Sequence, residues 1–126
     1  MAIKKHILYI EDHEDTRELI SFVLKQRNYE VTTSETIESG VRLASENKYD
    51  LYLLDSWLPD GSGLELCRKI REFDGRTPIL FYSAAAFEID RELALRNGAQ
   101  GYLTKPTHNA ELCDLISVLI NNRDGH

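Results

Sequence analysis

Short apolar runs alternate with longer amphipathic segments along the chain, and this alternation is the feature that most limits the possible folds. The apolar runs lie at residues 7–10, 51–54 and 78–82, with weaker ones at 30–33 and 101–104. Amphipathic segments between them predict helices at residues 15–27, 37–47, 63–71, 88–96 and 109–121. Such alternation is typical of an α/β fold, in which right-handed crossovers join parallel strands. The sequence therefore predicts a doubly wound, five-stranded parallel sheet with helices on both faces.

The strongest apolar runs also indicate how the sheet is covered. They are continuous, without the polar alternation of a half-exposed strand, which indicates strands that are buried on both faces. The 126 residues match the usual size of one domain, and no repeat or linker divides them. We expect a single domain over residues 1–126, with its core at about 6–122 and no room for an output domain after the last helix.

Composition and charge argue against several classes of protein. The formal net charge is −6 and no basic stripe is present, so direct nucleic-acid binding is not expected. Cys67 and Cys113 are far apart and lack metal-ligand spacing, which favours buried, reduced thiols over a disulfide or a zinc site. No apolar run reaches the ~20 residues that span a membrane, and the N-terminus does not resemble a signal peptide. These features predict a cytoplasmic protein with no membrane association.

Acidic, hydroxyl and basic side chains follow four of the five predicted strands. Glu11 and Asp12 end the first strand, Asp55 the third, Ser83 the fourth and Lys105 the fifth. Ligands of open α/β sheets bind beyond the carboxyl ends of the strands. We therefore expect three carboxylates, a hydroxyl and a cation to meet at one edge of the sheet.

Such a cluster needs a cation and points to phosphoryl chemistry. Three neighbouring carboxylates repel one another unless a cation lies among them, and an all-oxygen site suits Mg²⁺ or Mn²⁺ better than zinc. A metal and Lys105 on either side of Asp55 would neutralise a transferring phosphoryl group. The sequence thus predicts that Asp55 is the nucleophile, with Ser83 placed to donate a hydrogen bond to a phosphoryl oxygen.

The residues at the strand ends resemble a known family. From residue 7 to about 120 the chain is similar to the CheY-like receiver domains of bacterial response regulators. The matching positions are Glu11-Asp12, Asp55 with Pro59-Asp60-Gly61, Ser83-Ala84, Tyr102 and Lys105-Pro106. The resemblance implies a flavodoxin-like (βα)5 fold with strand order 2-1-3-4-5. It identifies the chain as a single-domain response regulator, or as a receiver excised from a longer protein.

The resemblance also assigns roles at the acidic cluster. Asp55 would accept a phosphoryl group from a sensor histidine kinase or a histidine phosphotransfer protein. Asp12 and Asp55 would bind Mg²⁺ directly, with the Trp57 backbone carbonyl as the third protein ligand and Glu11 acting through water. Mn²⁺ would substitute for Mg²⁺. The protein would be a signalling switch, and not an enzyme beyond its own phosphorylation and slow dephosphorylation.

Further roles belong to the last two strands. Lys105 would pair with the phosphoryl group, Ser83 would move to bond it, and Tyr102 would then turn inward. The Lys105–Pro106 peptide bond would be cis. These changes would remodel the face formed by residues 88–96, 101–104 and 109–121, where a downstream protein would dock. The protein would be a monomer or a phosphorylation-dependent dimer.

Two positions differ from what the resemblance leads one to expect, and two other functions are weaker alternatives. Trp57 is bulky beside the acceptor, and Ala85 has no polar group to orient an attacking water, which predicts slow loss of the phosphoryl group. A haloacid-dehalogenase-like phosphatase would need an acid at position 57, where Trp57 stands. A pseudo-receiver would lack part of the acid, acceptor and lysine set, which is complete in this chain.

A glycine-rich stretch near the acceptor is open to a simpler interpretation. Gly61-Ser62-Gly63 resembles a phosphate-binding loop only superficially, because no GxxxxGK[ST] motif surrounds it. We expect a turn at Gly61 followed by Ser62 as the N-cap of the helix at 63–71.

Overall fold

A five-stranded, fully parallel sheet forms the centre of the protein, whose structure is a computed structural model describing residues 3–125. The strands are β1 (His6–Ile10), β2 (Glu30–Ser34), β3 (Leu51–Leu54), β6 (Ile79–Ser83) and β7 (Gly101–Thr104). They are arranged β2-β1-β3-β6-β7, which is the order 2-1-3-4-5 when only these strands are counted. The predicted flavodoxin-like fold is confirmed.

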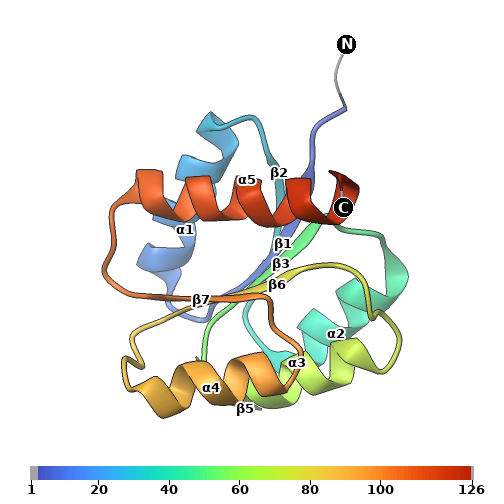
Figure 1. The fold of residues 1–126 in the computed structure, drawn as a ribbon, viewed down its shortest axis with the longest axis vertical. Helices are drawn as coiled ribbons and strands as arrows, with labels where there is room; N and C mark the ends of the chain where they lie inside the picture. The colour runs from blue at the N-terminus through green and yellow to red at the C-terminus, as the bar shows by residue number, and fades with distance from the viewer. Residues whose placement is uncertain (1–2, 126) are drawn as a thin grey trace.

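Helices cover both faces of this sheet. They are α1 (Glu14–Gln26), α2 (Ile37–Glu46), α3 (Gly63–Arg71), α4 (Glu88–Arg96) and α5 (Asn109–Gly125). Figure 1 shows α1 and α5 on one side of the sheet and α2, α3 and α4 on the other. Ile7 and Tyr9 of β1 pack into the core beneath α1 and α5, whereas Leu8 and Ile10 pack beneath the other three helices. Strand alternation thus divides the apolar residues between two cores.

Several details of the helices differ from the sequence-based expectation. The first helix, predicted at residues 15–27, spans Glu14–Gln26 and has His13 as its N-cap, whose ring nitrogen accepts from the N–H of Thr16. Leu19 lies in this amphipathic segment but is 57% exposed. Both cysteines are buried, as predicted. Within residues 3–125, no helix combines the length and the apolar character that crossing a bilayer demands.

A small antiparallel hairpin, which the apolar pattern does not predict, lies between β3 and α3. Its strands are β4 (Trp57–Leu58) and β5 (Gly61–Ser62), and Gly61 adopts a φ of 149° in the turn. The carboxylate of Asp60 accepts from the backbone N–H of Ile37 at 2.8 Å and of Glu38 at 3.1 Å. Asp60 thereby links the hairpin turn to the N-terminus of α2. A negative charge is favourable at that end of a helix.

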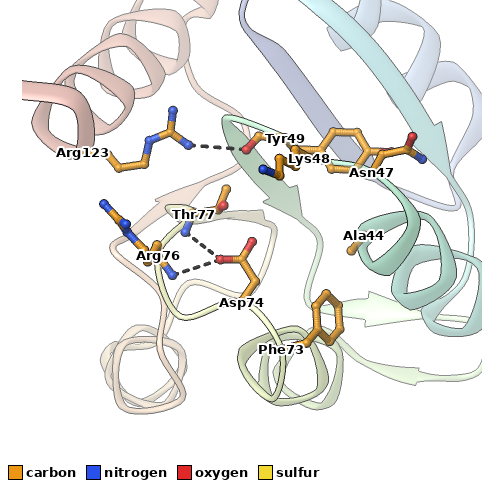
Figure 2. A pocket seen from close by; sticks show the side chains of 9 residues that line it. All are labelled: Ala44, Asn47, Lys48, Tyr49, Phe73, Asp74, Arg76, Thr77 and Arg123. Carbon is orange, nitrogen blue, oxygen red and sulfur yellow. Dashed lines mark hydrogen bonds between the residues drawn. The ribbon is translucent and has the colours of Figure 1, made fainter.

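Asp74 secures the opposite end of the sheet, beside a cavity of about 340 Å³ at the amino ends of β3 and β6. Figure 2 shows its carboxylate between the backbone N–H groups of Arg76 and Thr77, each at 3.0 Å. The buried hydroxyl of Tyr52 donates to the other oxygen at 2.8 Å. Burial acts to raise the pKa of Asp74, but hydrogen bonds from Thr77, Arg76 and Tyr52 outweigh it and lower the pKa to about 2.

Replacing Asp74 with alanine should destabilise the protein by about 2 kcal/mol at pH 7, since three donors lose their acceptor. Because the folded-state pKa is depressed, this stabilisation is complete above about pH 4 and is lost as the pH falls towards 2. Urea unfolding at pH 7 and pH 3 measures the difference, which should shrink at the lower pH. Asp114→Ala, at an exposed position on α5, is the control and should change stability by less than about 0.5 kcal/mol.

Candidate functional site

The register of the sheet brings the predicted site residues to one edge. β1 and β3 pair Ile10 with Leu54, so Glu11 and Asp55 follow side by side, and the Asp55 N–H donates to the Ile10 carbonyl at 3.2 Å. On the other side of β6, the N–H of Lys105 donates to the Ser83 carbonyl at 2.7 Å. Because parallel strands end at the same edge, side chains that are far apart in the sequence become neighbours.

Two buried carboxylates share one lysine at this edge. Glu11 is 1% exposed and Asp55 8% exposed. The Lys105 ammonium lies 2.5 Å from Oε1 of Glu11 and 3.7 Å from Oδ2 of Asp55. Lys105 also lies over the ring of Tyr82, with its nitrogen 5.4 Å from the ring centroid. The Lys105 ammonium therefore lies closer to Glu11 than to Asp55, the predicted phosphoryl acceptor.

The pKa shifts of the two carboxyl groups agree with these distances. Burial, followed by the negative charge of Glu11, raises the pKa of Asp55 to about 6. Burial also acts to raise the pKa of Glu11, but the hydrogen bond and the positive charge of Lys105 outweigh it and lower the pKa. One lysine thus compensates Glu11 well and Asp55 incompletely. A further cation at this place would be bound favourably.

Asp12 completes an acidic cluster with these two residues. One carboxylate oxygen from each of Glu11, Asp12 and Asp55 lies within 4.8 Å of the others, and Asp12 is exposed to solvent. Arg17 secures the chain here, because its guanidinium donates to the Glu11 carbonyl at 3.0 Å and pairs with Glu35 at 3.0 Å. Carboxylate oxygens with access to water are the ligand set that Mg²⁺ prefers, so the cluster fits this ion.

Asp55 itself is held on two sides. Its Oδ1 accepts from the N–H of Ser56 at 2.7 Å, which leaves Oδ2 on the side of Lys105. Gly63, the first residue of α3, packs against its backbone, and a Cβ on Gly63 would lie 2.1 Å from the Asp55 carbonyl oxygen. Ser62 is the N-cap of this helix and accepts from the N–H of Glu65, as predicted. Asp55 therefore lies at a closely packed junction of β3 and α3.

Ser83 and Tyr102 both contact Ala85 in the loop after β6. The buried hydroxyl of Ser83 accepts from the Ala85 N–H at 3.1 Å, and the Tyr102 hydroxyl donates to the Ala85 carbonyl at 2.6 Å. The Tyr102 ring is half-buried and stacks on Phe81, with centroids 5.9 Å apart. The backbone of one residue thus joins the strand-end hydroxyl to the tyrosine of the next strand.

A cavity of about 370 Å³ lies beside Tyr102, where α4, β7 and α5 meet. Phe87, at the N-cap of α4, borders it and is 79% exposed. Charged groups from both helices, including Arg91 and Glu111, also line it. The surface beside Tyr102, whose hydroxyl donates to the Ala85 carbonyl, is therefore partly apolar and partly charged.

The remaining predicted residues lie at the margin of the site. The Lys105–Pro106 peptide bond is cis, as the resemblance implied. The Trp57 side chain is 66% exposed on β4. The structure thus brings Glu11, Asp12, Asp55 and Lys105 together, with Ser83 on the adjoining strand. The metal-ligand roles of Trp57 and Glu11 stay predictions.

Three residues at the site were not identified from the sequence. Arg17 bonds the backbone of the acidic loop, Gly63 packs against Asp55, and Tyr9 is buried beneath the carboxylates in β1. Tyr9 and Glu11 are two residues apart and therefore share a face of the strand. That spacing was a usable signal for Tyr9, whereas the contacts of Arg17 and Gly63 depend on the fold.

Comparisons with known proteins agree on one family. The sequence model of the response regulator receiver domain matches residues 7–117. The cell cycle response regulator CtrA of Brucella ovis is 38% identical over 120 residues, covering 95% of this chain and 52% of that protein. The chain spans about half the length of the curated relatives that it matches.

Solved structures give the same result. A CheY-like response regulator receiver domain protein from Methanospirillum hungatei superposes with a TM-score of 0.93 at 24% identity, covering 98% of both chains, which concerns the fold alone. The receiver domain of sensor histidine kinase PA1611 from Pseudomonas aeruginosa is 33% identical, with a TM-score of 0.88 over 94% of this chain and 99% of that one. That structure holds a magnesium ion coordinated in its active-site cleft.

Proposed function

The chain belongs to the response regulator receiver domain family, and on this premise we propose that Asp55 accepts a phosphoryl group in a phosphorylation-controlled signalling switch. The observation that carries the proposal is the position of Asp55, whose buried carboxylate lies beside Glu11 and Asp12 and 3.7 Å from Lys105. The phosphoryl donor would be a sensor histidine kinase or a histidine phosphotransfer protein. The protein would catalyse no reaction other than its own phosphorylation and dephosphorylation.

The arrangement of Asp55 suits an in-line attack on phosphorus. The Ser56 N–H holds Oδ1, which leaves Oδ2 as the attacking oxygen. A bond forms between Oδ2 and phosphorus while the bond from phosphorus to the donor's nitrogen breaks, and that nitrogen then takes up a proton. Lys105, next to Oδ2, would neutralise the charge on the transferring oxygens. Positioning and charge are the main requirements of phosphoryl transfer, and the chain supplies both.

Receiver domains bind Mg²⁺ at an acidic site, and the cluster of Glu11, Asp12 and Asp55 is placed to hold it here. A bound Mg²⁺ would compensate the carboxylates and the phosphoryl oxygens. Asp12 and Asp55 would bind the ion directly and Glu11 through water, with the Trp57 carbonyl as a further ligand. Mn²⁺, which also prefers oxygen ligands, would substitute for Mg²⁺.

Ala85 offers a route from phosphorylation to the surface. If the Ser83 hydroxyl turns to bond the phosphoryl group, the Ala85 N–H loses its acceptor and the loop shifts. The Ala85 carbonyl moves with it and releases the Tyr102 hydroxyl, so the ring can turn further inward. The surface around the adjoining cavity of α4, β7 and α5 would then change shape, and a downstream protein would dock there.

Incubation with acetyl phosphate and Mg²⁺, followed by intact-mass measurement, tests the proposal. The wild-type protein should gain one phosphoryl group, and Asp55→Asn should gain none because its amide is not a nucleophile. Asp114→Asn, at an exposed position on α5 outside the acidic cluster, should still be phosphorylated. Absence of any gain in the wild-type protein would rule out the proposed function.

The phosphoryl group should be lost slowly, with a half-life of minutes or longer. Ala85 has only a methyl group to offer near the Ser83 loop, so no side chain there orients an attacking water. A time course of intact mass after removal of acetyl phosphate measures the half-life. Ala85→Asn should shorten it by adding a polar group, and a half-life of seconds in the wild-type protein would contradict the prediction.

A further inference from the structure

Tyr9 has a buried hydroxyl without a hydrogen-bond partner, directly below the acidic cluster. The side chain is 0% exposed, and no described residue makes a hydrogen bond of ordinary distance and angle with its oxygen, although the Glu11 carboxylate is near enough to interact with it. A buried polar group without a partner costs about 1–3 kcal/mol, and nearly all such groups in proteins are paired. The orphaned hydroxyl therefore needs an explanation, and a partner acquired in another state of the protein would provide one.

The surroundings of the hydroxyl indicate which partner this is. Tyr9 lies two residues before Glu11 on one face of the strand, and its pairing partner Leu53 lies two before Asp55. Burial, followed by the negative charges of Glu11 and Asp55, raises the pKa of Tyr9. The phenol therefore keeps its proton at neutral pH and can act as a donor to a carboxylate.

Lys105 explains why the Tyr9 hydroxyl does not make a full hydrogen bond to Glu11 in this structure. Its ammonium already occupies Oε1 of Glu11 at 2.5 Å, while the backbone N–H of His13 donates to Oε2 at 3.2 Å. Both oxygens of Glu11 thus have a donor. Once Lys105 turns to a phosphoryl group on Asp55, the carboxylate of Glu11 loses its closest partner while it stays 1% exposed.

We propose that the Tyr9 hydroxyl is a reserve donor that bonds the Glu11 carboxylate when Lys105 leaves it. The inference rests on the proposed function, in which Lys105 moves to the phosphoryl group. Tyr9 is in this view a positioning residue, because it would keep Glu11 in place beside the metal without touching the phosphoryl group. A buried carboxylate left with one donor fewer would otherwise oppose phosphorylation.

A double-mutant cycle in thermal stability tests the inference without phosphorylation. With Lys105 present, Tyr9→Phe should leave the melting temperature unchanged or raise it, because it removes an unpaired hydroxyl. In the Lys105→Met background, Tyr9→Phe should lower it by roughly 5 °C, since Glu11 then depends on the phenol. If Lys105→Met alone does not fold, the cycle is measured with Asp55→Asn added, which removes one of the two carboxylates that Lys105 compensates. Equal shifts in both backgrounds would overturn the inference.

Phosphorylation kinetics supply the second measurement. Tyr9→Phe should slow uptake of the phosphoryl group from acetyl phosphate by about three- to tenfold, the net contribution of one typical hydrogen bond. Tyr52→Phe is the matched control, since its equally buried hydroxyl bonds Asp74 at the other end of the sheet. It should lower the melting temperature and leave the rate unchanged. An unaltered rate in Tyr9→Phe would contradict the inference. If the wild-type protein takes up no phosphoryl group, the proposed function is contradicted, and the double-mutant cycle in thermal stability alone decides on Tyr9.

Discussion

Replacing Gly63 with alanine should destabilise the protein by about 3 kcal/mol, which corresponds to a fall of roughly 10 °C in the melting temperature. The new Cβ would lie 2.1 Å from the carbonyl oxygen of Asp55 and 2.9 Å from the ring of Phe81. The carbonyl belongs to the backbone and cannot rotate away as a side chain would. The first turn of α3 must therefore move away from the end of β3.

The same substitution should weaken Mg²⁺ binding, because Asp55 is displaced with its backbone. The single tryptophan, Trp57, lies two residues after Asp55, so its fluorescence is a convenient probe of a magnesium titration. Gly75→Ala is the matched control, since a Cβ there meets nothing within 4 Å and the residue does not have a positive φ. It should change stability by less than about 0.5 kcal/mol. Equal stability of the two variants would show that α3 can shift without cost.

Gly63 illustrates what the sequence can and cannot predict about this site. The residues around it predicted a turn at Gly61 and a cap at Ser62, because turn and cap preferences depend on neighbours in the chain. The close approach of Gly63 to Asp55 depends on how α3 packs against β3. Such contacts become visible only when the distance between elements is known.

The fold was predictable for a similar reason. Continuous apolar runs and amphipathic segments are local patterns, so β3 and β7 were predicted at their observed bounds and the other three sheet strands to within one residue. Strand order came from the resemblance, since alternation alone does not specify it. The two-residue strands β4 and β5 are too short to carry a pattern, and the hairpin was missed.

The chemistry of the site was predictable as a set of residues but not as a geometry. Strand ends identified Glu11, Asp55 and Lys105 as neighbours. They did not show that Lys105 lies 2.5 Å from Glu11 and 3.7 Å from Asp55, which depends on the relative height of the strand ends. The unequal sharing of this cation is the basis of the remaining prediction.

Asp55→Asn should stabilise the Mg²⁺-free protein by up to about 3 kcal/mol at pH 8, although it should abolish the proposed phosphorylation. Burial, followed by the charge of Glu11, raises the pKa of Asp55 from 3.8 to about 6, and its side chain is only 11% exposed. A raised folded-state pKa means that this carboxyl favours folding below about pH 4 and that the benefit is lost as the pH rises through 6. Asparagine removes the charge and keeps an oxygen for the Ser56 N–H.

Urea unfolding in the presence of a chelator, from pH 4 to pH 8, measures this gain. The advantage of Asp55→Asn should be small at pH 4, grow through pH 6 and level off above it. Added Mg²⁺ should then stabilise the wild-type protein more than the variant, because the variant lacks one carboxylate of the proposed metal site. A variant that is less stable than the wild-type protein at pH 8 without Mg²⁺ would show that Lys105 already compensates both carboxylates. In that case the repulsion between Glu11 and Asp55 would already be compensated, and it would not favour binding of Mg²⁺.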